Sequence, residues 1–145
     1  MSKPPPLIAV VDDEESVRRA LERLLRSAGF AVETFASGAG FLRSVLDHRP
    51  ACVVLDLHMP DLSGLDVQLF LTRDRVQVPV IMVTGHETPE AKARLMARGA
   101  TACLRKPVDD KVLLAAIDDA IRSAPAMASG QTGAGETREG IEWKK

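Results

Sequence analysis

The chain has 145 residues, of which 46% are hydrophobic and 27% charged, and its formal net charge is −1 at pH 7. A chain of this length is expected to form one domain with a sizeable core. The near-neutral charge argues against a nucleic-acid-binding surface spread over the domain. No apolar stretch reaches the roughly 20 residues of a membrane span, and residues 1–6 lack the apolar core of a signal peptide. We therefore expect a cytoplasmic protein that binds neither DNA nor membranes.

Five short segments of strand character, four of them apolar runs, alternate with five segments of helical periodicity along the chain. Apolar runs without internal polar side chains predict buried strands of a parallel sheet. The expected strands are residues 8–11, 32–35, 52–55, 80–83 and 101–104, and the expected helices are residues 17–28, 37–49, 63–74, 88–99 and 109–121. Because crossovers between parallel strands are right-handed, this order predicts an α/β fold. We expect a single (βα)5 doubly wound sheet of five parallel strands in the flavodoxin-like order 2-1-3-4-5.

The helical segments carry apolar residues at helical spacing, which predicts one buried face on each. The first is expected to bury Val17, Ala20, Leu21, Leu24, Leu25 and Ala28, the second Phe41, Leu42, Val45 and Leu46, and the last Val112, Leu113, Ala116, Ile117, Ala120 and Ile121. Cys52 and Cys103 lie in apolar runs without metal-site or CxxC spacing. We expect both to be buried thiols, which suits a reducing compartment.

The two ends of the chain differ in composition from its middle. Residues 1–6 precede the first strand and contain three prolines in a row, so we expect a short N-terminal extension. Residues 124–145 are rich in Gly, Ser and Thr and hold too few large apolar residues to offset the entropy of ordering them. We therefore predict a domain over residues 7–123 and a flexible tail or linker over residues 124–145.

The four apolar runs are each followed by polar residues suited to holding a phosphoryl group. Asp12 and Asp13 follow residues 8–11, Asp56 follows residues 52–55, Thr84 follows residues 80–83, and Lys106 comes shortly after residues 101–104. Ligands of open parallel sheets bind beyond the carboxyl ends of the strands, so these side chains are expected to converge on one edge. Adjacent acidic residues after a strand often only cap the next helix. Chance placement of all these residue types at strand ends is nevertheless improbable.

Three neighbouring carboxylates repel one another unless a cation binds between them. Oxygen-only ligands suit Mg²⁺ or Mn²⁺, and such an ion neutralises charge on a phosphoryl group. Lys106 would supply a fixed positive charge for another phosphoryl oxygen, and Thr84 a hydroxyl donor for a third. Asp56 is then left with a free oxygen to act as the nucleophile and to form an aspartyl phosphate.

These residues together resemble the receiver domain of two-component response regulators, over about residues 7–123. The resemblance rests on four motifs, which are Val11-Asp12-Asp13-Glu14, Leu55-Asp56-Leu57-His58-Met59-Pro60-Asp61-Leu62-Ser63-Gly64, Val83-Thr84-Gly85 and Arg105-Lys106-Pro107. It implies a bacterial-type signalling protein that accepts a phosphoryl group on Asp56 from a histidine kinase or phosphotransfer protein. Such a protein catalyses its own phosphorylation and dephosphorylation and is not an enzyme in the ordinary sense.

The resemblance also implies roles for individual residues. Mg²⁺ would be held by Asp13, Asp56 and the backbone carbonyl of His58, with Asp12 acting mainly through water. Lys106 would bind the phosphoryl group, next to a cis peptide bond to proline. Phosphorylation would alter the surface of the fourth helix, the last strand and the last helix. This surface would then signal to an output domain or partner protein, or form a homodimer.

One position departs from the family pattern. The family usually has Tyr or Phe three residues before the strand-five lysine, where this chain has Cys103, which is too small to act as the same lever. We therefore hypothesise that the signal depends on movement of the loop after Thr84 and of the fourth helix. His58 and His86 follow Asp56 and Thr84 by two residues, where a histidine could tune hydrolysis. The alternative is that both are solvated loop residues without a kinetic role.

Three other functions fit part of the pattern. A haloacid-dehalogenase-type phosphatase also uses an Asp at a strand end, but it needs a second acid where this chain has His58. A dinucleotide-binding domain needs a Gly-rich turn after the first strand, where the acidic residues 12–15 would repel a pyrophosphate. The third is a receiver-like scaffold or adaptor that binds proteins without phosphorylation, and it is the alternative to the receiver function.

Overall fold

A computed structural model describes residues 4–85 and 87–124 of the chain. Its sheet consists of β1 (Leu7–Val11), β2 (Ala31–Phe35), β3 (Cys52–Asp56), β4 (Val80–Thr84) and β5 (Ala102–Arg105). The strands are parallel and lie in the order β2-β1-β3-β4-β5. The predicted strand order is therefore confirmed.

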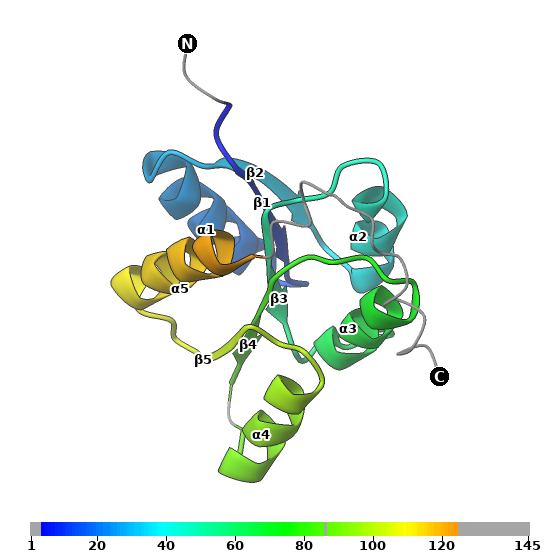
Figure 1. Ribbon diagram of the computed structural model, residues 1–145. Coiled ribbons are helices and arrows are strands. Elements are labelled where there is room, and N and C mark those ends of the chain that lie inside the picture. Colours follow the sequence, from blue (N-terminus) through cyan, green and yellow to red (C-terminus); the bar gives the residue numbers. More distant parts are fainter. Residues whose placement is uncertain (1–3, 86, 125–145) are drawn as a thin grey trace.

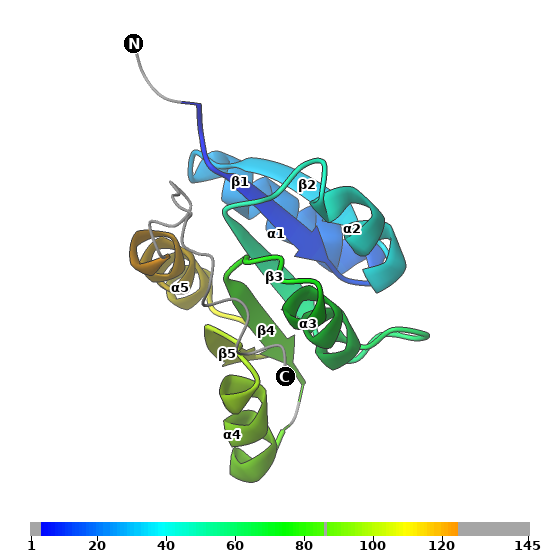
Figure 2. The same cartoon turned by 45° about the vertical axis from the view of Figure 1, so that its right-hand side comes forward.

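Helices cover both faces of the sheet (Figures 1 and 2). They are α1 (Glu15–Ser27), α2 (Gly38–Val45), α3 (Gly64–Arg73), α4 (Pro89–Ala97) and α5 (Asp110–Ser123). The side chains of α1 and α5 pack on one face, and those of α2, α3 and α4 pack on the other. Successive residues of a strand point to opposite faces, so Ile8 and Val10 contact the first layer and Ala9 and Val11 the second.

Side-chain caps fix where four of the helices begin. Ser37, Ser63, Thr88 and Asp109 each accept a hydrogen bond from the backbone N–H three residues later. Such bonds satisfy an N–H group that has no partner within the helix. The predicted starts of the second and fourth helices, at Ser37 and Thr88, are therefore confirmed, and Pro89 occupies the first turn of α4 as expected.

Some predicted core residues are not buried. Leu46 is 71% exposed because α2 ends at Val45, before the helical face is completed. Val112 is 50% exposed although Leu113 next to it is buried. Cys103 is only partly buried, whereas Cys52 is fully buried with a pKa raised by burial to about 12. Periodicity identified the apolar faces correctly, but neighbouring elements do not cover these positions.

The apolar face of α1 differs most from its prediction. Leu25 is buried, Ala20 and Ala28 are exposed, and the other predicted residues are intermediate. Ala28 lies at the C-cap of α1, and the others, Val17, Ala20, Leu21 and Leu24, line an open pocket of about 490 Å³ between α1 and α5. Because α5 does not close over this end of α1, the face stays partly accessible.

Several predictions fall on residues outside the described part of the chain. These are His86, the first three residues of the N-terminal extension and the tail from residue 125 onward. Within the described residues, none of the helices has the length and apolar character needed to cross a membrane.

Candidate functional site

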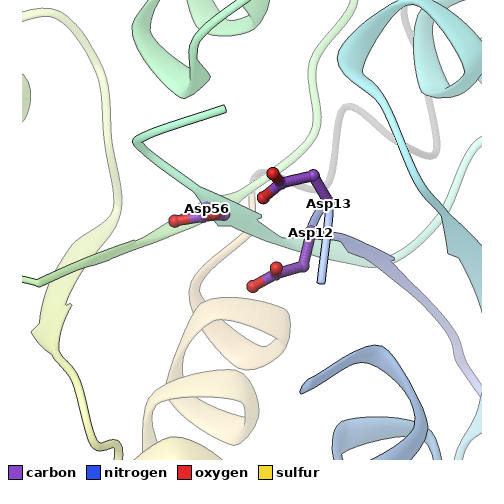
Figure 3. A group of neighbouring side chains, drawn as sticks. All are labelled: Asp12, Asp13 and Asp56. Atoms are coloured by element: carbon purple, nitrogen blue, oxygen red, sulfur yellow. The ribbon is translucent and has the colours of Figure 1, made fainter. Parts of the chain in front are cut away.

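Asp12, Asp13 and Asp56 lie together at the carboxyl ends of β1 and β3 (Figure 3). Each offers a carboxylate oxygen, and these oxygens lie within 4.8 Å of one another. The cause is the sheet order, since β1 and β3 are neighbours with Val11 paired to Leu55. Asp12 and Asp56 are only 3% and 4% exposed, whereas Asp13 is exposed to solvent.

The two oxygens of Asp12 have different neighbours. Its Oδ1 accepts a hydrogen bond of 2.9 Å from the backbone N–H of Glu14, and its Oδ2 lies 3.6 Å from the Nζ of Lys106. Glu14 itself occupies the N-cap position of α1. Asp12 and Asp13 therefore precede the helix and do not cap it, so the capping alternative is wrong.

Lys106 brings a positive charge to the acidic cluster from the far side of β4. Its Nζ lies 3.3 Å from Asp56 Oδ1, and its peptide bond to Pro107 is cis, as the family resemblance implies. Burial lowers the pKa of Lys106, but Asp12 and Asp56 outweigh this effect and raise it. The lysine is therefore held in its charged form.

The pKa of Asp56 is raised above its ordinary value. The causes are burial and then the negative charge of Asp12, and they outweigh the opposing effects of Lys106 and the His58 N–H. The ammonium group of Lys106 pairs with two of the three clustered carboxylates and so does not balance their charge. Three carboxylate oxygens with a deficit of positive charge are a donor set that suits a hard divalent cation such as Mg²⁺. Asp12, Asp13 and Asp56 are the residues placed to hold it.

Thr84 ends β4, which lies between β3, where Asp56 is the last residue, and β5, which Lys106 directly follows. It is 5% exposed, and its carbonyl accepts a hydrogen bond of 2.7 Å from the Lys106 N–H. Asp56 pairs with Val83, directly before Thr84. The structure therefore places the five residues singled out from the sequence at one edge of the sheet.

The segment after Asp56, residues 57–63, is called the acceptor loop here. It is tied to the sheet because the Leu57 N–H donates to the Val83 carbonyl, and it closes with a bond from the Gly64 N–H to the Leu57 carbonyl. A Cβ on Gly64 would lie 2.7 Å from the Asp56 carbonyl oxygen and 2.8 Å from Met82 Sδ. Only glycine fits this approach, a role that the sequence motif alone did not reveal.

His58 connects the acceptor loop to the segment that follows β4. Its backbone N–H donates to Asp56 Oδ1 at 3.4 Å, and its ring Nε2 lies 2.6 Å from Glu87 Oε2. The His58 side chain is 65% exposed and that of Glu87 is 18% exposed. Sequence reasoning missed Glu87 because no motif or periodicity marks a contact between two loops.

The family model for the response regulator receiver domain matches residues 8–118. The chain belongs to this family. Receiver domains are parts of signalling proteins of two-component systems. The match confirms the family predicted from the sequence, and the strand order confirms the predicted fold. The acidic cluster occupies the edge of the sheet where this family typically binds Mg²⁺.

One relative matches almost the whole of this chain but is itself a longer protein. The response regulator protein TodT of Pseudomonas putida is 36% identical over 142 residues, which is 98% of this chain and 63% of TodT. The chain therefore spans less than two thirds of that relative.

Solved receiver domains also share the fold. The crystal structure of FixJ-N matches with a TM-score of 0.78 and 35% identity, covering 87% of this chain and 99% of that one. A response regulator receiver domain protein from Clostridium thermocellum matches with a TM-score of 0.76 and 33% identity, covering 81% and 94% of the two chains.

Proposed function

We propose that this receiver domain accepts a phosphoryl group on Asp56, from a histidine kinase or a phosphotransfer protein, in a reaction that depends on Mg²⁺ or Mn²⁺. The observation that carries the proposal is the position of Asp56. It is buried at the end of a central strand, shares a cluster with Asp12 and Asp13, and lies 3.3 Å from Lys106 Nζ.

Asp56 acts as the nucleophile. One of its carboxylate oxygens forms the new bond to phosphorus, while the bond between phosphorus and the donor nitrogen breaks and its electron pair stays on the donor imidazole. The phosphoryl group is lost by hydrolysis, in which a water oxygen bonds to phosphorus, the bond between phosphorus and the Asp56 oxygen breaks, and inorganic phosphate leaves the restored carboxylate. We expect His58, two residues after the acceptor, to tune this step, and we expect the same of His86 from its place in the sequence.

The remaining residues neutralise and orient the phosphoryl group. Asp12, Asp13, Asp56 and the backbone carbonyl of His58 would hold the cation, with Asp12 contributing mainly through water. A bound cation would offset the negative charge of the phosphoryl oxygens. Lys106 provides a second positive charge and Thr84 a hydroxyl donor.

The output is a change in the surface formed by α4, β5 and α5. Because Cys103 replaces the usual aromatic residue, the change would run through the loop after Thr84 and through α4. The altered surface would bind an output domain or partner protein, or form a homodimer. We place this function in residues 7–123 and regard residues 124–145 as a tail or linker. The cytoplasm, which is reducing, suits two cysteines that are both free.

Intact mass measurement tests this function. Incubation of the chain with acetyl phosphate and Mg²⁺ should add the mass of one phosphoryl group, and chelation of Mg²⁺ should prevent the gain. Asp56→Ala should add nothing under the same conditions. If the chain with intact Asp56 gains no mass with any donor, the proposal is wrong and a scaffold that binds without phosphorylation becomes the better reading.

A further inference from the structure

The helix expected to carry the signal is only lightly anchored in the core. Of the residues of α4, Leu95 is buried, while Met96 is 41% exposed. Elements with few buried apolar side chains open and shift at a lower free energy than the rest of a fold. The position of α4 therefore depends strongly on the polar contacts at its two ends.

The residues that flank α4 at its two ends form hydrogen bonds with the acceptor loop and with α3, which follows that loop. At the C-terminal end, the buried Gln68 of α3 donates from its Nε2 to the Arg98 carbonyl at 2.6 Å. Before the N-terminal end, Glu87 Oε2 bonds with His58 Nε2 at 2.6 Å. Glu87 directly precedes Thr88, whose hydroxyl caps α4, so a shift of Glu87 must move the start of the helix.

The contact at the N-terminal end continues to the acceptor. Asp56 Oδ1 accepts from the His58 N–H, and the His58 ring bonds with Glu87. Asp56 and Thr84 end neighbouring strands, and the His58–Glu87 bond joins the two loops that follow these strands. Two hydrogen bonds through one residue therefore lead from the acceptor carboxylate to the residue before the α4 cap.

Glu87 also lies beside the position where the chain departs from its family. Burial raises the pKa of the Cys103 thiol, Lys92 lowers it and Glu87 raises it further, so both charged groups act on this thiol. Cys103 belongs to β5, which packs against α4. The His58–Glu87 bond thus reaches α4 at the place where the aromatic lever is missing.

We propose that Glu87 is a positioning residue for phosphorylation of Asp56, because its bond with His58 holds the loop after β4 and the start of α4 against the acceptor loop. This inference rests on the proposed phosphorylation of Asp56. The proposed signal requires the loop after β4 to move, and the His58–Glu87 bond opposes that movement. Breaking the bond releases α4 and speeds the modification of Asp56.

Hydrogen exchange of the unphosphorylated protein tests the positioning directly. Glu87→Ala and His58→Ala should each speed exchange of the α4 amides by about two- to fivefold, the range expected for loss of a half-exposed polar pair. Glu90→Ala removes the same charge from the exposed first turn of α4 and is the matched control. Equal exchange in Glu87→Ala and Glu90→Ala would overturn the inference.

Rates of phosphorylation by acetyl phosphate test the link to the acceptor. Glu87→Ala should raise the rate by about two- to fivefold, and Glu87→Gln, which keeps an acceptor oxygen, should restore a rate close to that of the unsubstituted protein. Glu87→Ala should have no further effect in a His58→Ala background. If Glu87→Ala raised the phosphorylation rate equally in the unsubstituted protein and in the His58→Ala variant, Glu87 would act independently of His58. That result would contradict the proposal.

The two measurements separate the inference from the proposed function. If the unsubstituted protein takes up no phosphoryl group, the proposed function fails, while the exchange data still report whether Glu87 positions α4. If the protein is phosphorylated but exchange and rates do not respond to Glu87→Ala, the function stands and the inference is wrong.

Discussion

The Nζ of Lys106 lies 3.3 Å from Asp56 Oδ1, and the same ammonium group lies 3.6 Å from Asp12 Oδ2. One lysine, 31% exposed at its side chain, therefore serves two carboxylates that are almost fully buried. Removal of one partner from such an arrangement leaves the other charges uncompensated. Lys106 is thus expected to support both the fold and the chemistry.

Lys106→Ala should slow phosphorylation of Asp56 by acetyl phosphate by about 10- to 100-fold, because a positive charge facing the phosphoryl oxygens is lost. It should also lower the free energy of unfolding at pH 7 by about 1 kcal/mol. Time courses of intact mass and thermal unfolding check the two effects. Lys111→Ala, in the exposed first turn of α5, is the control and should leave both unchanged. Equal behaviour of the two variants would contradict the role of Lys106.

Asp56→Asn should stabilise the protein at pH 7. The pKa of Asp56 is raised in the folded state above its ordinary value of 3.8, so its favourable contribution exists at low pH and is lost as the pH rises through the folded-state pKa. Removing the charge should raise the Tm at pH 7 by about 2–5 °C and leave it nearly unchanged at pH 3. Asp118→Asn, on the exposed side of α5, should show no such pH-dependent gain. A lower Tm for Asp56→Asn at pH 7 would refute this electrostatic account.

Mg²⁺ should raise the Tm of the protein because a ligand that binds only the folded state stabilises it, by about 2.7 kcal/mol at a hundredfold excess over Kd. Asp13→Asn removes one of the three clustered carboxylates and should weaken the response. Thermal unfolding over a series of Mg²⁺ concentrations gives the comparison. Glu15→Gln, whose side chain pairs with Arg19 away from the cluster, should keep the full response. An undiminished shift in Asp13→Asn would exclude Asp13 as a ligand.

Gly64→Ala should destabilise the protein by about 1–3 kcal/mol, the usual range for overpacking. The added Cβ would come within 2.7 Å of the Asp56 carbonyl oxygen, which is backbone and cannot give way easily. Gly85→Ala is the matched control, since a Cβ there would meet nothing within 4 Å. Denaturant unfolding measures both variants. If the two alanine variants are equally stable, the close approach at Gly64 does not limit the fold.

The fold could be predicted from the sequence because its three central strands, β1, β3 and β4, are buried on both faces. Runs such as residues 52–55 and 80–83 contain no polar side chain, and they alternate with segments of helical period. Which helix residues are buried by neighbouring elements could not be predicted in the same detail. Periodicity identifies the apolar face of a helix, but whether a neighbour covers Leu46 or Val112 depends on element lengths and packing.

The clustered part of the site was predictable for a topological reason. Asp12, Asp56 and Lys106 come directly after or at strand ends, and parallel strands bring these ends to one edge. Contacts between loops were not predictable. The His58–Glu87 and Gln68–Arg98 bonds join residues about 30 positions apart, with no periodic signal linking the partners.

The central claim is that Asp56 itself receives the phosphoryl group. An aspartyl phosphate is reduced by borohydride to homoserine, so treatment after incubation with acetyl phosphate and Mg²⁺ marks the modified residue in peptide mass spectra. We expect the mark on Asp56, none on Asp12 or Asp13, and none anywhere in Asp56→Ala. A mark on a different residue of the unsubstituted protein would contradict the account.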